Sequence, residues 1–437
     1  MSNHHVIHRF RLKAFEAITA KVSFADSLTK LSALNKCIDE ATEKKLKDAY
    51  ADFEREYKEH VDSSNFFKRD FTKMAQKIRN SVDTDTPQAI VAGVFAVWSL
   101  DSCRDVAHER GSTPPMMRPL PVQVLAIFRM LGVDQDGWFE RMKRKIMGGG
   151  AVSMIRNHLV QIKTGEGKSV VLGVLATVLA LSGYNVDCVC YSQYLSRRDR
   201  GTFANVFDYF KVGAQVKYAT FAELSEQVID ADGNVRDLVE DFLHGHRSKK
   251  LAVSKMPRIL LIDEVDVFFS ADFYGATYNP VTTYSDKLGH VHTVQRFIWA
   301  GRMDSFSAAK RKLEALEAYT ELLSAHKLLK DVISNHSIKM LRDVREEHTY
   351  ELKDGLIAYR DQDIMSTTIR HGYLTLFAYF KEHEAGNITE ESLTAELGLS
   401  IHCGHFSYAE LPSKYSQILG VTGTLDSLGE LCAQAPF

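Results

Sequence analysis

The sequence has no apolar stretch long enough to cross a membrane. A transmembrane helix needs roughly 20 consecutive apolar residues, and the longest apolar run here, Val170 to Leu181, is much shorter. That run directly follows a glycine-rich loop, so we expect it to form a buried helix. The N-terminal residues Met1 to Arg11 also lack the apolar segment of a secretory signal peptide. Both absences predict a cytoplasmic protein.

An excess of positive charge is absent as well. The 437 residues contain 54 Lys and Arg against 56 Asp and Glu, a formal net charge of -2. We therefore expect no global positive field that would gather nucleic acid or anionic lipid. The best local basic patch is Arg141, Lys143, Arg144 and Lys145, and such a short run is usually one solvated helix face. Nucleic acid is not favoured as a partner.

Cysteine is sparse and has no framework spacing. Six cysteines are scattered along the chain, which predicts reduced thiols in a cytosolic compartment rather than a disulfide scaffold. Cys188 and Cys190 alternate along an expected strand and should face the same way. We expect a buried pair there rather than a metal site.

The composition that remains is that of a folded, multidomain protein. Hydrophobic residues make up 45% and charged residues 25%, which is typical of globular proteins, and the length suggests roughly two to four domains. Short β-branched runs alternate with helical stretches from Val122 to Phe269, which predicts an α/β fold with a doubly wound parallel sheet. The expected division is an N-terminal helical region at 1–110, the α/β lobe at 111–272, an inserted α+β domain at 273–405, and a return to the lobe at 406–437.

The strongest chemical signal is a phosphate-binding loop at Thr164, Gly165, Glu166, Gly167, Lys168 and Ser169. Its two glycines let backbone N–H groups turn toward phosphate oxygens, Lys168 supplies positive charge, and the Ser169 hydroxyl can bind Mg²⁺. The usual eight-residue pattern has a further glycine where this chain has Ile162. That variation occurs among helicase-like motors.

A second signal lies about a hundred residues later. The apolar run Ile259 to Ile262 leads into Asp263 and Glu264, and a buried parallel strand ends at the sheet edge where ligands bind. We expect Asp263 to hold Mg²⁺ and Glu264 to orient and deprotonate the attacking water. Upstream, Arg118 and Gln123 are candidates for contacts with an adenine base, because an amide can donate and accept at the adenine edge.

Together these motifs resemble the SecA family of preprotein-translocase ATPases. The order of the motifs agrees with the family over about Phe95 to Leu428. The matching stretches are Arg118 to Gln123, Lys163 to Ser169, Tyr194 to Asp199, Asp263 to Asp266, Tyr350 to Gly355 and Gly420 to Thr424.

The resemblance implies a P-loop, RecA-like motor lobe that binds ATP or ADP with Mg²⁺. It implies adenine contacts at Arg118 and Gln123, phosphate and metal contacts at Lys168 and Ser169, and hydrolytic acids at Asp263 and Glu264. It also places Gly423 and Thr424 in a motif that couples nucleotide state to domain motion. Arg197, Arg198 and Asp199 match a segment that faces a second motor lobe.

The resemblance further implies partners for the chain. The insert would correspond to a preprotein-crosslinking domain that clamps an unfolded polypeptide, and a membrane translocase would place the protein in the cytoplasm or peripherally at a membrane. The sequence ends about a dozen residues after Thr424, so we expect the second RecA-like lobe with its arginine finger to be absent and hydrolysis by this chain to be slow. Two alternatives stay open: a helicase-type ATPase fragment and a non-hydrolytic nucleotide-binding scaffold.

Overall fold

The computed structural model describes ten segments of the chain, namely residues 23–35, 38–62, 70–110, 116–134, 157–244, 257–268, 277–326, 329–361, 364–367 and 370–424. The chain divides into two compact units, which we describe one at a time. The first unit consists of residues 1–232, 251–278 and 406–437, and the second of residues 233–250 and 279–405. The basic run at 141–145 lies outside the described residues.

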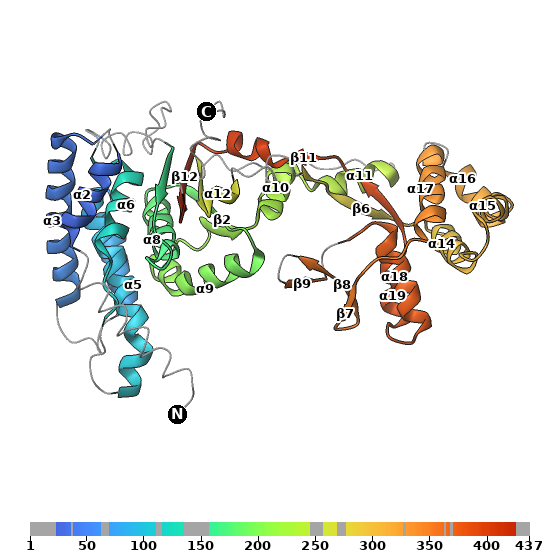
Figure 1. Ribbon diagram of the computed structural model, residues 1–437, viewed down its shortest axis with the longest axis horizontal. Coiled ribbons are helices and arrows are strands. Elements are labelled where there is room, and N and C mark those ends of the chain that lie inside the picture. Colours follow the sequence, from blue (N-terminus) through green and yellow to red (C-terminus); the bar gives the residue numbers. More distant parts are fainter. Residues whose placement is uncertain are drawn as a thin grey trace. The chain divides into compact units, whose positions relative to one another are not determined.

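Helices form the N-terminal part of the first unit, as the sequence predicts (Figure 1). Helices α3 and α5 pack along each other, and α4 packs against α5. Side chains mark the N-terminal ends of two shorter helices: Ser23 and Asp70 cap α2 and α4 by accepting from backbone N–H groups. These helices are α2 (Phe24–Leu34), α3 (Glu40–Asp62), α4 (Phe71–Ser81), α5 (Pro87–Arg110) and α6 (Pro121–Leu131).

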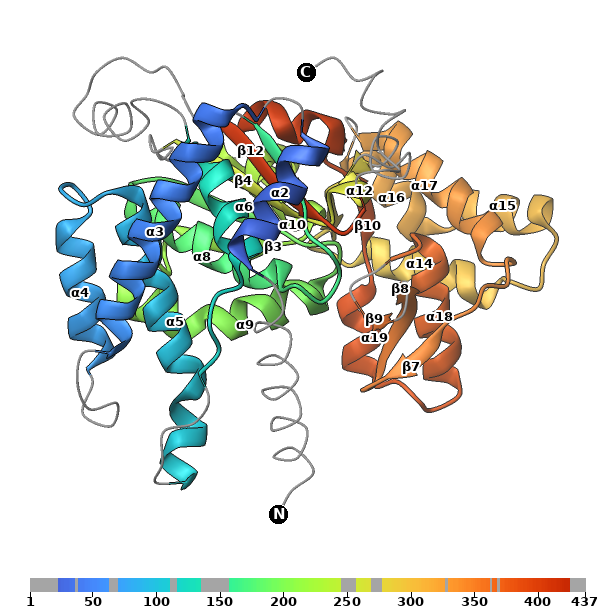
Figure 2. The same cartoon turned by 60° about the vertical axis from the view of Figure 1, so that its left-hand side comes forward.

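A five-stranded, wholly parallel sheet forms the centre of the first unit, with strand order β1-β12-β4-β2-β3. The last strand of the chain, β12, lies between β1 and β4, where Figure 2 shows it beside β4. The sequence predicts a return of the chain to this lobe at 406–437, and β12 lies in that stretch. The strands are β1 (His158–Gln161), β2 (Asn185–Val189), β3 (Val216–Ala219), β4 (Arg258–Asp263) and β12 (Gln417–Thr422).

Both faces of this sheet are buried, which explains the continuous apolar runs. Along β4, Ile259 and Leu261 belong to one apolar cluster, whereas Leu260 and Ile262 belong to another on the opposite face. Helices follow the strands and cover them, so the predicted doubly wound α/β fold is confirmed. The connecting elements are α8 (Lys168–Leu181), α9 (Gln193–Phe210), α10 (Phe221–Ile229), the 3₁₀ helix η2 (Asp230–Asp232), α12 (Val265–Phe268), β5 (Thr277–Tyr278), β11 (Phe406–Ser407) and the 3₁₀ helix η4 (Tyr408–Lys414).

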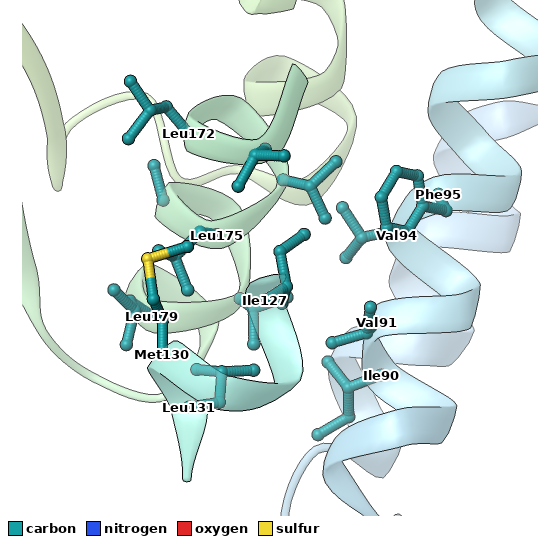
Figure 3. Packing of buried hydrophobic residues seen from close by; sticks show 14 of the residues in the cluster. Ile90, Val91, Val94, Phe95, Ile127, Met130, Leu131, Leu172, Leu175 and Leu179 are labelled. Carbon is teal, nitrogen blue, oxygen red and sulfur yellow. The ribbon is translucent and has the colours of Figure 1, made fainter. Parts of the chain in front are cut away.

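The apolar cluster that contains Ile259 and Leu261 also includes side chains of the N-terminal helices and of the helix that follows the phosphate loop. Figure 3 shows side chains of α5, α6 and α8 meeting in one interior. The fully apolar run after Ser169 is therefore a buried helix, as expected, and it has no polar face because helices surround it. The labelled contributors are Ile90, Val91, Val94, Phe95, Ile127, Met130, Leu131, Leu172, Leu175 and Leu179.

The second unit is α+β and has its own apolar core. Its strands form two antiparallel sheets. In one, β6 pairs with β10, and in the other β8 lies between β7 and β9 and pairs with both. A hairpin turn joins β7 to β8, with Asp354 and Gly355 at φ of 53° and 74°. Its elements are α11 (Val235–His244), β6 (Val281–Tyr284), α14 (His290–Ala300), α15 (Phe306–Glu314), α16 (Glu317–Ala325), α17 (Lys330–Asp343), β7 (Glu351–Lys353), β8 (Leu356–Asp361), β9 (Ile364–Ser366), α18 (Tyr373–Glu384), α19 (Glu390–Glu396) and β10 (Leu399–His402).

Helix α11 differs from the sequence-based division, which placed residues 233–250 in the α/β lobe. In the structure this helix packs against β6 of the second unit. The Arg236 Nε donates to the Val281 carbonyl at 3.1 Å, and Thr282 bonds to Glu240. An amphipathic repeat identifies a helix with one buried face but does not identify what covers that face.

Among the helices within the described ranges, none is both long enough and apolar enough to cross a membrane.

Candidate functional site

The phosphate loop connects β1 to the first turn of α8 at the carboxyl edge of the sheet. Gly165 and Gly167 have φ of 91° and 82°, a region that side chains other than glycine rarely adopt. No side chain caps α8, whose N-cap is Gly167. A helix N-terminus of this kind attracts anions. Thr164 and Gly165 are exposed, so the loop is accessible to a ligand.

Gln123 braces this loop from α6. Its Nε2 donates to the Glu166 carbonyl at 2.8 Å, while its Oε1 accepts from the Leu120 N–H at 2.9 Å. A Cβ on Gly167 would lie 2.5 Å from the same Nε2, so only glycine fits there. Gln123 is 1% exposed, and both ends of its amide are therefore engaged with the protein. The sequence predicted an adenine contact at Gln123, and it did not foresee this bracing contact.

Arg118 lies on the wall of a cavity of about 570 Å³ beside α2 and α3. Tyr50 and Glu54 of α3 line the same cavity. The two predicted adenine-contacting residues thus have different surroundings, since Gln123 contacts the loop and Arg118 faces this cavity.

Glu166 stabilises the loop from within. Its side chain accepts from the Lys163 N–H at 3.1 Å, and its carbonyl receives the bond from Gln123. The residue was predicted as part of the phosphate cradle, and these contacts show how it fixes the cradle's shape.

Lys168 and Glu264 form an ion pair across the site. Lys168 Nζ lies 3.0 Å from Glu264 Oε1, and the two side chains are 14% and 36% exposed. The backbone of Glu264 is left-handed, with φ of 59°, a conformation that costs about 1–3 kcal/mol in a residue with a side chain. Such strain concentrates at functional sites. Here it turns the Glu264 carboxylate toward the loop.

Asp263 is buried at the end of β4, and one of its oxygens is unsatisfied. Within the described residues, Oδ1 has no hydrogen-bond partner. Burial raises the pKa of this carboxyl to about 6, with further contributions from the negative charges of Glu264 and Asp199. An unsatisfied buried carboxylate oxygen suits a cation, and Mg²⁺ prefers oxygen ligands. Asp263 and the Ser169 hydroxyl therefore fit the residues that would hold this ion.

Asp199 of α9 lies beside Ser169 and Asp263, and the sequence did not predict this position. The Ser169 Oγ donates to Asp199 Oδ2 at 3.1 Å, and Arg198 Nε lies 2.8 Å from Asp199 Oδ1. Motif resemblance had assigned Asp199 only to a surface facing a second lobe. A signal existed, because Asp199 occupies the buried stripe of α9 that also holds Phe203 and Val206. A charged residue on such a stripe is uncommon and indicates a partner.

Other residues of the same motif do lie on the exposed side of α9, where a surface that faces a second lobe is expected. Tyr194 is 60% exposed, the Arg198 side chain is 49% exposed, and Arg197 is also exposed.

The two strand cysteines have different surroundings. Cys188 lies in the apolar core of the unit, as expected for a buried pair. Cys190, which follows β2, is also buried, but its Sγ lies within 4.8 Å of carboxylate oxygens of Asp199 and Asp263. Both thiols are buried, as expected, and Cys190 in addition lies beside two carboxylates.

The end of β12 reaches the same loop. A Cβ on Gly423 would lie 3.2 Å from Thr164 Oγ1 and 3.4 Å from Lys168 Nζ. Thr422 Oγ1 donates to Asp266 Oδ1 at 2.8 Å and accepts from the Thr424 N–H at 3.2 Å. These bonds connect the segment after β12 to the segment after β4.

Comparison with known proteins gives a consistent picture. A family model described as the SecA DEAD-like domain matches residues 17–270, more than half of the chain. Proteins named protein translocase subunit SecA are similar to this chain. The one from Mycobacterium avium is 30% identical over 197 residues, covering 42% of this chain and 22% of that protein. The one from Clostridium kluyveri is 26% identical over 213 residues, covering 44% and 25%.

A third relative of the same name, from Cyanidioschyzon merolae, is 31% identical over 123 residues, covering 27% of this chain and 16% of that protein. The matches thus span a quarter or less of the length of these relatives. Over more than half of its own length, however, this chain matches one family, and it belongs to the SecA DEAD-like domain family.

Proposed function

We propose that this chain is the first motor lobe of a SecA-like protein translocase, which binds ATP with Mg²⁺, hydrolyses it and couples the reaction to polypeptide binding. The supporting observation is the convergence of four side chains at the carboxyl edge of the parallel sheet. They are Lys168, Ser169, Asp263 and Glu264. This edge is where open α/β sheets bind ligands.

Each of these residues has a distinct proposed role. Lys168 leaves Glu264 and binds the β- and γ-phosphates, which offer a stronger negative charge. Glu264, released from the ion pair, orients a water molecule and accepts its proton as the water oxygen attacks the γ-phosphorus. The bond from the γ-phosphorus to its bridging oxygen breaks, giving ADP and phosphate. Asp263 and Ser169 would hold Mg²⁺, which supplies charge neutralisation at the phosphates when bound.

Gln123 and Arg118 are proposed to recognise the adenine base. For Gln123 this requires an exchange of partners, because its amide is bonded to Leu120 and Glu166. We propose that base binding and loop conformation are coupled through this amide. Gly423 and Thr424 are proposed to respond to the phosphates, since the segment lies beside Thr164 and Lys168.

The second unit is proposed to bind an unfolded polypeptide, with a membrane translocase as a further partner. We retain the proposed division at 1–110, 111–272, 273–405 and 406–437, with helix α11 assigned to the second unit. Photocrosslinking of an unfolded peptide to residues 279–405 would support this role. Salt-sensitive binding of an oligonucleotide to the same residues would instead favour a helicase-type ATPase.

Turnover is expected to be slow when a second motor lobe is missing. An arginine finger contributes roughly 10³ to 10⁵ in rate in related phosphoryl-transfer enzymes, and the motif resemblance assigns that residue to a second lobe. Steady-state hydrolysis by the purified chain tests this point. A rate of several per second, about the lower range for such enzymes, would show that the arginine or a substitute is already present.

The central test is nucleotide binding by calorimetry. Lys168→Ala should weaken ATP affinity at least about tenfold, or about 1.4 kcal/mol, because the loop loses its positive charge. Lys163→Ala is the matched control, since this exposed lysine lies beside the loop and should leave affinity nearly unchanged. Glu264→Gln should retain binding and lower the residual hydrolysis rate. Equal affinity in Lys168→Ala and the wild type would refute the proposal, and binding without any Glu264-dependent hydrolysis would favour the scaffold alternative.

A further inference from the structure

Three buried side chains from three elements meet at the carboxyl edge of the sheet. Cys190 directly follows β2, Asp263 ends β4, and Asp199 lies in α9. They are 2%, 7% and 4% exposed, respectively. One ligand atom from each residue lies within 4.8 Å of the others. The pairing of β2 with β4, in which Val189 is opposite Ile262, brings the first two residues to the same level of the sheet.

We propose that Cys190, Asp199 and Asp263 bind a thiophilic divalent cation such as Zn²⁺, without any nucleotide. Zinc binds sulfur at about 2.3 Å and carboxylate oxygen at about 2.0–2.2 Å. A tetrahedral arrangement then places its ligands roughly 3.5 Å apart. The three atoms already lie within 4.8 Å of one another. Side-chain rotations that move these atoms by about an ångström would therefore bring them to the spacing that zinc requires. Three protein ligands leave a fourth position open.

An independent observation points to a cation at this place. Asp263 Oδ1 is buried and has no hydrogen-bond partner within the described residues. Two positive side chains that interact electrostatically with Asp263 are paired with other carboxylates: Lys168 with Glu264 at 3.0 Å, and Arg198 with Asp199 at 2.8 Å. A buried acceptor without a partner is costly. A bound cation would satisfy it.

The thiol determines which cation is favoured. Oxygen ligands alone suit Mg²⁺ or Ca²⁺, whereas a sulfur ligand favours Zn²⁺, Co²⁺ or Cd²⁺ over them. The thiol must lose its proton on binding, and that proton passes to the solvent buffer as the metal–sulfur bond forms. Asp199 would exchange its bond from the Ser169 hydroxyl for the metal and keep its ion pair with Arg198.

A regulatory consequence depends on the proposed function. Asp263 cannot hold both a thiophilic ion and the Mg²⁺ of a bound nucleotide. Zn²⁺ should therefore compete with nucleotide and Mg²⁺, which would make the motor lobe sensitive to free zinc. The binding claim itself does not require ATP hydrolysis.

The test is titration of the full, metal-free chain with Co²⁺ in the absence of nucleotide, followed by absorption spectroscopy. We expect a near-ultraviolet thiolate-to-cobalt charge-transfer band that Zn²⁺ removes and excess Mg²⁺ does not. Cys190→Ser should abolish the band. Cys188→Ser is the matched control, because this buried thiol lies two residues away in the apolar core, and it should keep the band.

Further variants make each outcome decisive. Asp199→Asn retains the thiol but removes a charged ligand, and it should lower the affinity for Co²⁺ at least about tenfold. Tenfold is the smaller effect that is typical when a residue that only supports a metal ligand is replaced. If circular dichroism shows that Cys190→Ser does not fold, Asp199→Asn serves as the test instead. Lys168→Ala should lose nucleotide but keep the cobalt band, which separates this proposal from the proposed function. No band in the wild type, or a full band in Cys190→Ser, would overturn the inference.

Discussion

Replacing Asp263 by Asn should stabilise the protein in the absence of nucleotide and metal. The native carboxyl keeps its proton up to a pH of about 6, because its pKa is raised by burial and by neighbouring acids. In the unfolded chain it ionises near its ordinary pKa of 3.8. Wild-type stability therefore falls as pH rises between these two values and is constant above them. The amide carries no charge, so the variant avoids this loss.

The magnitude follows from the difference between the two pKa values. A difference of roughly two units corresponds to about 3 kcal/mol, at 1.36 kcal/mol per unit. This full gain is expected at pH 8, and about half of it at pH 5, where the native carboxyl is still mostly protonated. The amide N–H of the variant can also donate to Asp199, whose carboxylate lies nearby.

The assay must report on the first unit alone, since the two units can unfold separately. We suggest urea unfolding with EDTA at each pH, read by pulse-labelling hydrogen exchange of peptides from β4 and β12. Glu264→Gln is the comparison variant, because it removes one of the charges that raise the Asp263 pKa but also breaks the pair with Lys168, and it should stabilise the protein less than Asp263→Asn does. Destabilisation by Asp263→Asn, or a gain that is the same at pH 5 and pH 8, would refute the reasoning.

Three other predictions test the framework around the site. Gln123→Glu keeps the side-chain shape but loses the donor to the Glu166 carbonyl, so ADP affinity measured by calorimetry should fall about tenfold; unchanged affinity would contradict the bracing role. Gly173→Ala should destabilise the first unit by about 1–3 kcal/mol in urea unfolding, because the new Cβ would lie 2.5 Å from the Phe203 ring. Lys211→Gly should instead stabilise it by about 0.5–1 kcal/mol, because Lys211 ends α9 with φ of 54°; a loss of stability there would show that the lysine side chain contributes more than its backbone costs.

The ion pair between Lys168 and Glu264 links binding to the hydrolytic step in the proposed cycle. In the structure each side chain neutralises the other. Phosphate binding would separate them and would free Glu264 for water only when Lys168 has a new partner.

Much of the fold could be predicted from the sequence by itself. The run Ile259 to Ile262 had no polar alternation, which indicates a strand buried on both faces. Glycines at 165 and 167, followed by Lys168 and Ser169, indicated a phosphate loop because few other sequences allow the backbone to turn in this way. Each of these signals depends on residues close together in the chain.

Tertiary structure decided what depends on residues far apart. The sequence-based division placed α11 in the α/β lobe, and only its packing against β6 assigned it to the second unit. Motif order located Gln123 without revealing that its amide is bonded to the loop 43 residues away. The meeting of Cys190 and Asp199 with Asp263 was likewise invisible, because strand order and helix placement bring these residues together. Local sequence specifies the conformation of each segment, whereas the pairing of segments depends on the free energy of burying them against one another.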